Sequence, residues 1–491
     1  MKRAKRLSLS MLLAVALVSM SCGGDDDSDA GPTTTITSDA PTTSGSGAAI
    51  PTTTVASVDP NLCPVKALDA ARGPVEVSFW HSMTAANEDA LKKLTEKYNA
   101  GQTKVKVALS FQGSYDESIQ KYVAGVRGGE LPSMIQTADT AMQTMIDSKS
   151  IVPIGACVAA ENYDLSDYSA GLIGQYSFAG VLQTMPFQLS NPILYYNKKA
   201  FRAAALDPEK PPTTLTEILE ASRKIVATGK ANGAADKGFA LEIQAWYPEQ
   251  FMAKAGEAVV NNDNGRAARA TAARLDSKTF TDTLQWIATM NKENLMLNAG
   301  RNVSGQNHFL AVANGDAAMT FGTSAALGTV YQLLPSFPNI EIGLAPLPGP
   351  TGAGAGVTIG GGSLYMSNKT SDEQKAGVWD FMKFLNTPEN QSFWHVNTGY
   401  IPTRISATRS AEVQAFWTQR PGFKVAYDQL AASKVPVGGG SALIGDYLGF
   451  RAALEASLES VVADGDVAKA QSKAQTDATK AITDYNRRIG A

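Results

Sequence analysis

The pattern of apolar and polar residues changes its period between residues 75 and 98. Apolar side chains occupy every second position from Val75 to Phe79, which is the period of a strand with one buried face. From Asn87 to Tyr98 they recur at every third or fourth position, which is the period of a helix. The polar and aromatic segment Trp80–Ser82 therefore stands at a predicted strand-to-helix junction, where side chains can cap a helix or hold a ligand.

The next hundred residues repeat this alternation. Residues 104–111 ("KVKVALSF") predict a second strand, and residues 118–129 predict a helix that ends at a glycine pair. Residues 131–154 follow as strand, turn and helix. Strands that alternate with helices favour a parallel or mixed sheet with helices on both faces, so we expect an α/β fold.

Two later stretches indicate that the chain passes between two halves. Residues 185–206 combine a proline-bearing extended run with an aromatic strand and a helix, and residues 343–366 are dense in glycine and proline. We interpret both as crossings between lobes, which makes each lobe discontinuous in sequence. Two hinged halves enclose a cleft, and ligands often bind in such clefts.

Composition narrows the function classes. A chain of 491 residues is long enough for two or three domains, and a hydrophobic fraction of 44% is ample for a core. The 43 basic and 46 acidic residues give a net charge of −3, so a nucleic-acid partner is not expected.

The N-terminus has the pattern of an export signal. A basic start is followed by about 13 apolar residues, fewer than the roughly 20 that a membrane-spanning helix needs, and then by small residues before Cys22. Residues 1–21 resemble a bacterial lipoprotein signal, with Ser19 where leucine is usual, so we expect lipid on Cys22 and anchoring to the outer face of the cell membrane. The alternative is plain cleavage. Residues 22–60 are rich in Gly, Ser, Thr, Pro and Asp and predict a flexible tether.

Three cysteines occur in the chain. If Cys22 carries lipid, Cys63 and Cys157 remain, and an exported compartment permits a disulfide between them. The alternative is a pair of free buried thiols.

Sequence motifs for catalysis are few. There is no nucleophile elbow, zinc-protease motif or phosphate loop, and the three histidines are scattered, so we expect neither a metal nor a cofactor. The best enzymatic alternative is an exported glycosidase with Asp116 and Asp139 as its carboxylate pair.

Aromatic residues in Gly-rich or polar contexts suggest a different chemistry. Aromatic faces stack on the C–H faces of sugars and polyols, while neighbouring hydroxyl and carboxylate groups bind their hydroxyls. Core packing is the alternative for each of these residues, which are Trp80, Tyr115, Trp246, Tyr247 and Tyr400.

Several longer segments, in order, carry a family resemblance: "FWHSM", "GSYDES", "QLSNPILYYNKKAF", "GDAAMTFGTS", "IGGGSLYM", "KFLNTPENQSFWHVNTGYIPTR" and "LESV". From about Val75 to its end the chain resembles the maltose-binding-like solute-binding proteins of ABC importers, and among them the sn-glycerol-3-phosphate-binding branch. The resemblance implies a two-lobed periplasmic-binding-protein fold that acts as a monomer and delivers a small-molecule ligand to membrane permease subunits. We place the first lobe at 61–187 and 341–395, and the second at 188–340 and 396–491.

The resemblance also implies which residues bind the ligand. Tyr115 and Asp116 match a pair that holds glycerol, Asp139 matches an acidic residue at a strand end, and Trp246 matches a stacking tryptophan. The remaining positions expected to line or close the cleft are His81, Ser82, Ser190, Ser324, Gly360, Gly361 and Tyr400.

Two positions depart from the family pattern. Ile243 stands where the family has a second tryptophan, and Leu443 stands where it has an arginine that pairs with phosphate. Loss of a bidentate guanidinium weakens recognition of a dianion unless Arg451 or Arg404 replaces it. The expected ligand is therefore glycerol-3-phosphate, a glycerophosphodiester or a related polyol or sugar, with a neutral oligosaccharide as the alternative.

Overall fold

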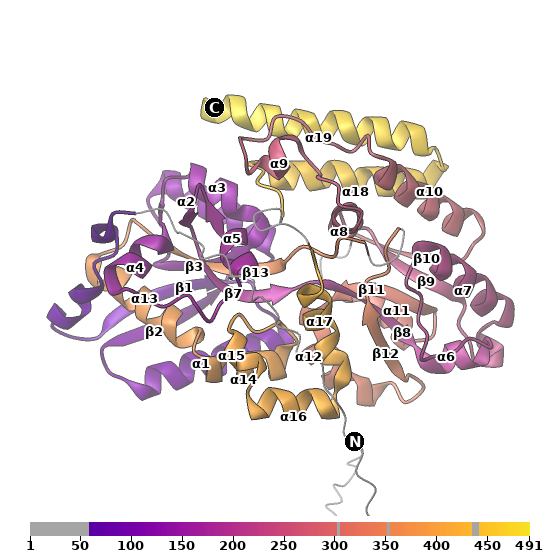
Figure 1. Cartoon of the computed structure of the whole chain (residues 1–491), viewed down its shortest axis with the longest axis horizontal. Coiled ribbons are helices and arrows are strands. Elements are labelled where there is room, and N and C mark those ends of the chain that lie inside the picture. Colours follow the sequence, from indigo (N-terminus) through magenta and orange to yellow (C-terminus); the bar gives the residue numbers. More distant parts are fainter. Residues whose placement is uncertain (1–57, 302–304, 351–353, 435–440) are drawn as a thin grey trace, which may run out of the picture. The chain divides into compact units, whose positions relative to one another are not determined.

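In the computed structural model, residues 58–301, 305–350, 354–434 and 441–491 are described, and they belong to one compact unit (Figure 1). The predicted signal peptide, Cys22 and most of the predicted tether lie outside the described residues. The folded body begins before residue 61, because Val58 already packs against a core cluster and the 3-10 turn Pro60–Leu62 follows it. Within the described ranges, no helix is both long and apolar enough to cross a membrane.

The first sheet confirms the predicted α/β pattern. Its strand order is β2-β1-β3-β13-β4, with β7 also paired to β13. Strands β1, β2 and β3 are parallel, whereas β13 runs antiparallel to its neighbours. The strands are β1 (Val75–His81), β2 (Val105–Phe111), β3 (Met134–Ala138), β4 (Ile151–Val152), β7 (Met185–Ser190) and β13 (Gly360–Ser367).

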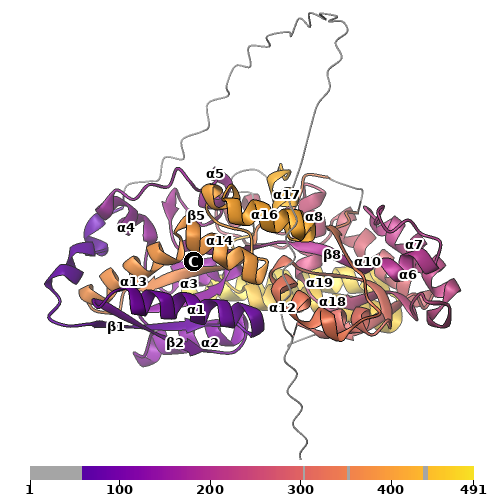
Figure 2. The same cartoon turned by 90° about the horizontal axis from the view of Figure 1, so that it is seen from below.

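Helices cover both faces of this sheet, because side chains along each strand alternate between them. Phe79 and Leu364 point into one core cluster, and the adjacent Ile135 and Tyr365 point into another. Helices α1 and α13 cover the first face and α2 the second (Figure 2). The helices and the small β5–β6 pair of this region are α1 (Ala85–Gly101), α2 (Tyr115–Gly128), α3 (Met142–Asp147), α4 (Ile154–Glu161), α5 (Ala170–Gln175), β5 (Ser177–Phe178), β6 (Val181–Leu182), α13 (Asp372–Leu385), α14 (Pro388–Thr398), α15 (Ile405–Thr408), α16 (Ala411–Gln419) and α17 (Val425–Ala431).

The chain reaches a second sheet through a single residue, Asn191, which lies between β7 and β8. This sheet has the order β10-β9-β11-β8-β12, with β8 antiparallel to both of its neighbours. Its strands are β8 (Pro192–Asn197), β9 (Lys237–Glu242), β10 (Met296–Gly300), β11 (Ala317–Thr323) and β12 (Ile342–Pro346).

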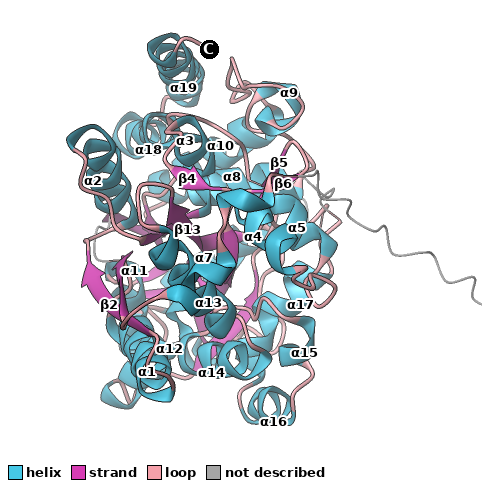
Figure 3. Cartoon of the chain, turned by 90° about the vertical axis from the view of Figure 1, so that its left-hand side faces the viewer, coloured by secondary structure: helices cyan, strands magenta, loops and turns pink. Residues whose placement is uncertain are grey.

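The helices around the second sheet include a long C-terminal pair, α18 and α19, which lie side by side (Figure 3). They pack on α10, so the C-terminus of the chain belongs to this half. The helices are α6 (Lys198–Ala203), α7 (Leu215–Thr228), α8 (Trp246–Lys254), α9 (Asn261–Gly265), α10 (Lys278–Lys292), α11 (Asn307–Ala313), α12 (Leu327–Leu333), α18 (Tyr447–Asp464) and α19 (Val467–Ile489). We call the two sheets with their helices the first and second lobe.

Two predicted lobe boundaries differ from the strand pairing and packing. The return crossing lies after Pro346, not at residue 341, because β12 pairs with β8 of the second sheet. The boundary at 395/396 falls inside helix α14. Beyond it, Val413, Trp417 and Phe423 belong to a core cluster that contains residues of both sheets, and α17 packs on β8 and β12, so residues 396–431 contact both lobes.

A disulfide joins Cys63 to Cys157, as the sequence led us to expect. Cys63 follows the turn Pro60–Leu62, and Cys157 lies in α4. Both cysteines are buried in the core cluster that contains Phe79 and Leu364. The bridge therefore fastens the segment before β1 to the first lobe.

We expect the double substitution Cys63→Ser and Cys157→Ser to lower the free energy of unfolding by about 2–4 kcal/mol. The bridge closes a loop with a sequence separation of 94 residues, which restricts the unfolded chain. Urea denaturation followed by circular dichroism measures the change. Reduction of the unsubstituted protein with dithiothreitol serves as the control and should give the same midpoint; an unchanged midpoint in both would contradict a stabilising bridge.

Candidate functional site

A cavity of about 380 Å³, which we call the cleft, is lined by both lobes. The first lobe contributes the residues after β1 and β3 and the ends of β7 and β13, and the second contributes the start of α8, helix α11 and one residue of α18. Helix α12, which follows β11 and packs on α1 and α14, also lines the cleft. Strand ends of an open α/β sheet are a common place for ligand sites. Of the predicted ligand residues, those that line the cleft are Ser82, Tyr115, Asp139, Ser190, Trp246, Gly360, Gly361 and Tyr400.

A buried glutamine, Gln136 of β3, organises the floor of the cleft. Its Oε1 accepts a hydrogen bond from the backbone N–H of Ser82 (2.9 Å), and its Nε2 donates to the Tyr115 hydroxyl (3.2 Å) and to Gln188. The Ser82 hydroxyl is buried and has no hydrogen-bond partner among the described residues. A buried hydroxyl without a partner is costly, so this group is well placed to bind a ligand hydroxyl or phosphate oxygen.

The glycines of "IGGG" are required by close approaches at the cleft wall. A Cβ on Gly360 would lie 2.6 Å from the Trp246 ring, so glycine leaves room for the indole. Gly361 has a φ of +114°, and a Cβ there would lie 1.9 Å from the Gln188 carbonyl oxygen. These two glycines let β13 pass directly beneath Trp246 and keep the aromatic face in the cleft.

One carboxylate and one guanidinium face the cleft. Burial raises the pKa of Asp139 to about 6, although a hydrogen bond from the Ser441 hydroxyl (2.8 Å) and the charge of Arg451 lower it. Arg451 forms a bidentate pair with Glu249, at 2.9 Å from Nε and 2.7 Å from Nη2. The positive charge of Arg451 is therefore already balanced, and the cleft is not a strongly basic site.

Tyr115 and Tyr400 remain neutral at physiological pH. Burial raises the pKa of Tyr115 well above its usual value and that of Tyr400 to about 12. Tyr400 also stacks on Trp394, with ring centroids 5.6 Å apart. Both hydroxyls can therefore donate hydrogen bonds from rigid positions.

Four predicted residues are buried and do not line the cleft. His81 is in the interior, where its Nδ1 accepts a hydrogen bond from the Met83 backbone N–H (3.3 Å), so it shapes the turn that carries Ser82. Ile243 packs in the core of the second lobe, and Ser324 is fully buried beside the lining residue Ala325. Leu443 is buried against α9, where its N–H donates to the Asn264 carbonyl (2.8 Å).

Asp116 lines a neighbouring cavity of about 270 Å³ instead of the cleft. Tyr115 and Ala138 line both cavities, so the two meet at the Tyr115 side chain. Successive residues at the start of a helix point about 100° apart, which explains why Tyr115 reaches the cleft and Asp116 does not. Tyr247 is also buried, and Trp80 packs against a core cluster, so core packing accounts for both.

Three polar residues that line the cleft were not predicted from the sequence, namely Gln244 and Gln306 of the second lobe and Asn87 of the first. Arg451, one of the two arginines expected to be able to contact a phosphate, does line the cleft. Gln244 could have been predicted from its position next to Ile243 in "LEIQAW". Because Ile243 is apolar and packs into the core, its neighbour points the other way.

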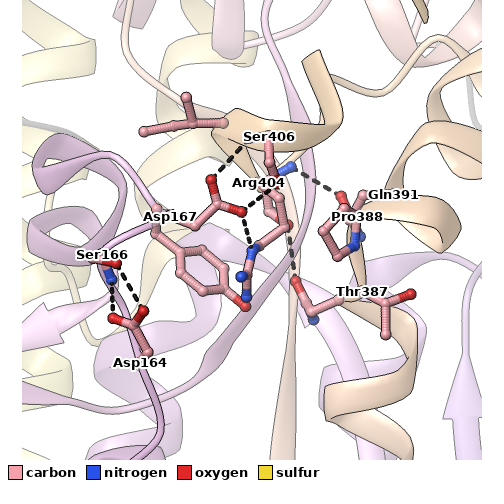
Figure 4. A network of polar contacts seen from close by, with 12 residues as sticks. Asp164, Ser166, Asp167, Thr387, Pro388, Gln391, Arg404 and Ser406 are labelled. Atoms are coloured by element: carbon pink, nitrogen blue, oxygen red, sulfur yellow. Dashed lines mark hydrogen bonds and ion pairs between the residues drawn. The ribbon is translucent and has the colours of Figure 1, made fainter. Parts of the chain in front are cut away.

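Arg404, the other arginine expected to be able to contact a phosphate, is not among the residues that line the cleft. It belongs to a polar network around Asp167 (Figure 4). Its Nε donates to Asp167 (2.7 Å), its Nη1 donates to the Tyr163 hydroxyl (2.9 Å), and its guanidinium lies over the Tyr168 ring. Asp167 also accepts hydrogen bonds from the backbone and hydroxyl of Ser406. Arg404 therefore fastens the segment after Tyr400 to the first lobe and does not serve the ligand.

Solved structures share this fold. The cyclic alpha-maltosyl-1,6-maltose binding protein from Arthrobacter globiformis aligns with a TM-score of 0.67 and 21% identity, covering 84% of this chain and 100% of that one. UgpB from Mycobacterium tuberculosis, solved in complex with glycerophosphocholine, aligns with a TM-score of 0.64 and 22% identity, covering 86% and 98%. Both likenesses support the two-lobed fold.

Curated relatives are similar at the sequence level. The sn-glycerol-3-phosphate-binding periplasmic protein UgpB of Pectobacterium atrosepticum is 31% identical over 366 residues, which is 73% of this chain and 80% of that protein. The protein of the same name from Brucella abortus is 31% identical over 353 residues, or 71% and 79%. Residues 93–423 also match the sequence pattern described as bacterial extracellular solute-binding protein. The chain therefore belongs to the bacterial extracellular solute-binding protein family.

Proposed function

We propose that this solute-binding protein captures a glycerophosphodiester and delivers it to the permease of an ABC importer. It acts as a monomer held at the outer face of the cell membrane by lipid on Cys22. Family membership and the names of the curated relatives support the transport role. The pattern of residues 1–24 supports export and the anchor.

The charge balance of the cleft carries the choice of ligand. A phosphomonoester bears a charge of roughly −1.5 to −2 at neutral pH and calls for an unpaired guanidinium or ammonium group. Among the described residues that line the cleft, Arg451 is the one Lys or Arg, and it is paired with Glu249. Leu443 stands where the family resemblance places an arginine. A phosphodiester, with a single negative charge, fits this balance better than a monoester.

The remaining wall suits the polyol part of such a ligand. Trp246 offers a stacking face, Asp139 accepts hydrogen bonds from hydroxyl groups, and Ser82 has a hydroxyl free for a ligand. These groups come from both lobes, so a ligand that contacts them together stabilises the closed arrangement of the lobes relative to an open one.

Binding without catalysis is supported by the positions of Asp116 and Asp139. A glycosidase needs two carboxyl groups on either side of one bond. Here Asp139 lines the cleft and Asp116 lines the neighbouring cavity.

A neutral oligosaccharide is the second candidate. The balanced charge and the stacking face of Trp246 suit it as well as they suit a phosphodiester, and the fold is shared with the cyclic alpha-maltosyl-1,6-maltose binding protein. It differs from the first candidate in needing no phosphate contact.

Isothermal titration of the protein with glycerophosphocholine, glycerol-3-phosphate and maltose tests the proposal. We expect saturable binding of glycerophosphocholine with an affinity at least about tenfold higher than that of glycerol-3-phosphate. Analysis of the titrated sample by chromatography should show the ligand intact. Preferential binding of glycerol-3-phosphate, or binding of maltose alone, would overturn the proposed ligand.

Replacing Trp246 by Ala should weaken binding of glycerophosphocholine about tenfold, because the stacking face is lost. Titration calorimetry of the two proteins measures the difference. The conservative variant Trp246→Phe keeps an aromatic face and should retain most of the affinity. Equal affinities for the Ala variant and the unsubstituted protein would exclude Trp246 from the site.

The variant Asp139→Asn should bind glycerophosphocholine at least about tenfold more weakly and yet be more stable at pH 7.5. Burial raises the pKa of Asp139 from 3.8 to about 6. Stability from this group is therefore fully present below pH 4 and is lost as the pH rises through about 6. Asparagine cannot ionise, so the variant should gain roughly 2–3 kcal/mol at pH 7.5.

Thermal unfolding at pH 7.5 and at pH 5 measures this effect. At pH 5 the carboxyl is mostly protonated in the folded protein but still mostly ionised in the unfolded chain, so the gap between the two melting temperatures should narrow to about half, and it should close only below about pH 4. A variant that is less stable than the unsubstituted protein at pH 7.5 would show that the buried charge is not costly.

A further inference from the structure

Ser441 forms hydrogen bonds through its hydroxyl, its backbone N–H and its carbonyl oxygen, and their partners come from different parts of the fold. Its hydroxyl donates to Asp139 Oδ2 (2.8 Å) and lies 3.0 Å from the carbonyl oxygen of Ile359, which precedes β13. Its backbone N–H donates to Gln175 Oε1 (3.2 Å), and its carbonyl oxygen accepts from Arg266 Nη2 (2.9 Å). A single serine thus links the cleft carboxylate to a guanidinium that does not line the cleft.

Burial of the Arg266 guanidinium costs free energy, because it removes a charged group from water. Burial lowers its pKa to about 10, although the charge of Asp139 raises it. Its Nη2 donates to carbonyl and amide oxygens of Gln175 (3.2 and 3.3 Å) as well as to Ser441, and its Nε is buried without a hydrogen-bond partner in the described part of the chain. The described residues place no carboxylate within ion-pair distance of it, unlike Arg269 three residues later, which pairs with Asp147. Burial of an unpaired cation lowers stability, so its retention calls for a role.

Arg266 lies close to the segment 441–443, which includes Leu443, the position where the family resemblance places an arginine. A Cβ on the preceding Gly265 would lie 2.3 Å from the Leu443 carbonyl oxygen. The Leu443 N–H in turn donates to the carbonyl oxygen of Asn264 (2.8 Å). The short chain stretch 264–266 is therefore held against residues 441–443.

The geometry points to Arg266 as a positioning residue that orients the Asp139 carboxylate through Ser441 and supplies, behind the cleft, a positive charge that is not paired with a carboxylate as that of Arg451 in the cleft wall is. The inference rests on the proposed function only in assigning Asp139 a ligand contact. Arg266 fixes the Ser441 carbonyl, which sets the direction of the Ser441 hydroxyl. That hydroxyl occupies Oδ2 of Asp139 and leaves Oδ1 to accept a hydrogen bond from the ligand.

This arrangement predicts how the ionisation of Asp139 depends on its neighbours. The Ser441 hydroxyl, the Arg451 charge and the Thr140 backbone N–H lower the pKa of Asp139, while burial and Glu249 raise it. The other ionisable groups that interact with it are Arg266, which stays charged between pH 5 and 8, and four tyrosines whose raised pKa values keep them neutral below pH 10, namely Tyr115, Tyr176, Tyr365 and Tyr447. Loss of the Ser441 bond or of the guanidinium behind it should therefore move the protonation midpoint of Asp139 upward.

Two measurements on the full chain test this inference. The first is the affinity for glycerophosphocholine by calorimetry between pH 5 and 8, in which affinity falls as Asp139 becomes protonated. The second is a carbon-13 NMR titration of the Asp139 carboxyl without ligand, assigned by comparison with Asp139→Asn. We expect Arg266→Gln and Ser441→Ala each to raise the midpoint by at least about half a pH unit, and Arg266→Lys to lie between Arg266→Gln and the unsubstituted protein.

Arg269→Gln is the matched control, since Arg269 lies on the same segment and pairs with Asp147 at 2.7 and 3.0 Å, away from Asp139. It should leave the midpoint unchanged. A midpoint that Arg266→Gln does not move, or that Arg269→Gln moves equally, would overturn the inference. If the unsubstituted protein fails to bind glycerophosphocholine, the proposed ligand is wrong, and the NMR midpoints still decide the role of Arg266.

Discussion

The arrangement of the two lobes depends on a connection between them that is a single buried residue. Asn191 joins β7 of the first sheet to β8 of the second, and its side chain is held by the Ala426 carbonyl oxygen and by Gln429 at 2.9 and 3.0 Å. Its own carbonyl accepts the N–H of Ser324, next to the end of β11. Strand ends of both sheets are therefore brought together at a fixed point. The cleft lies there because Ser190 and Thr323 flank this crossing and line the cleft.

The wall of the cleft is held in a fixed shape, and its charged groups are largely paired within the protein. Glycines at 360 and 361 let Trp246 cover β13, and Gln136 sets the positions of Ser82 and Tyr115. The charged groups, in contrast, are largely satisfied by the protein itself, because Arg451 pairs with Glu249 and Asp139 is bonded by Ser441. This charge balance is the reason to propose a ligand with hydroxyl groups and a single negative charge instead of a doubly charged phosphate.

Local pattern was enough to predict the scaffold but not the reach of each side chain. The strand that starts at Val75 and the helix that runs to Tyr98 were predicted from the spacing of their apolar residues. The return crossing that ends near Gly360 was predicted from its density of glycine and proline. The placement of β12 and of helices α14 to α17 depends on packing partners far away in sequence, so the predicted lobe boundaries missed it. Similarly, Tyr115 and Asp116 are neighbours in sequence and enter different cavities. Arg266 carries no local signal, because only the folded chain brings it to Ser441.

The disulfide has a mechanical consequence for the proposed lipid anchor on Cys22. The bridge to α4 fixes the segment before β1 to the first lobe, so any load applied through the N-terminus is borne by that lobe alone. Relative to the proposed attachment at Cys22, the first lobe is then the stationary part. In the proposed closure, the second lobe, which carries Trp246 and Arg451, is the part that moves.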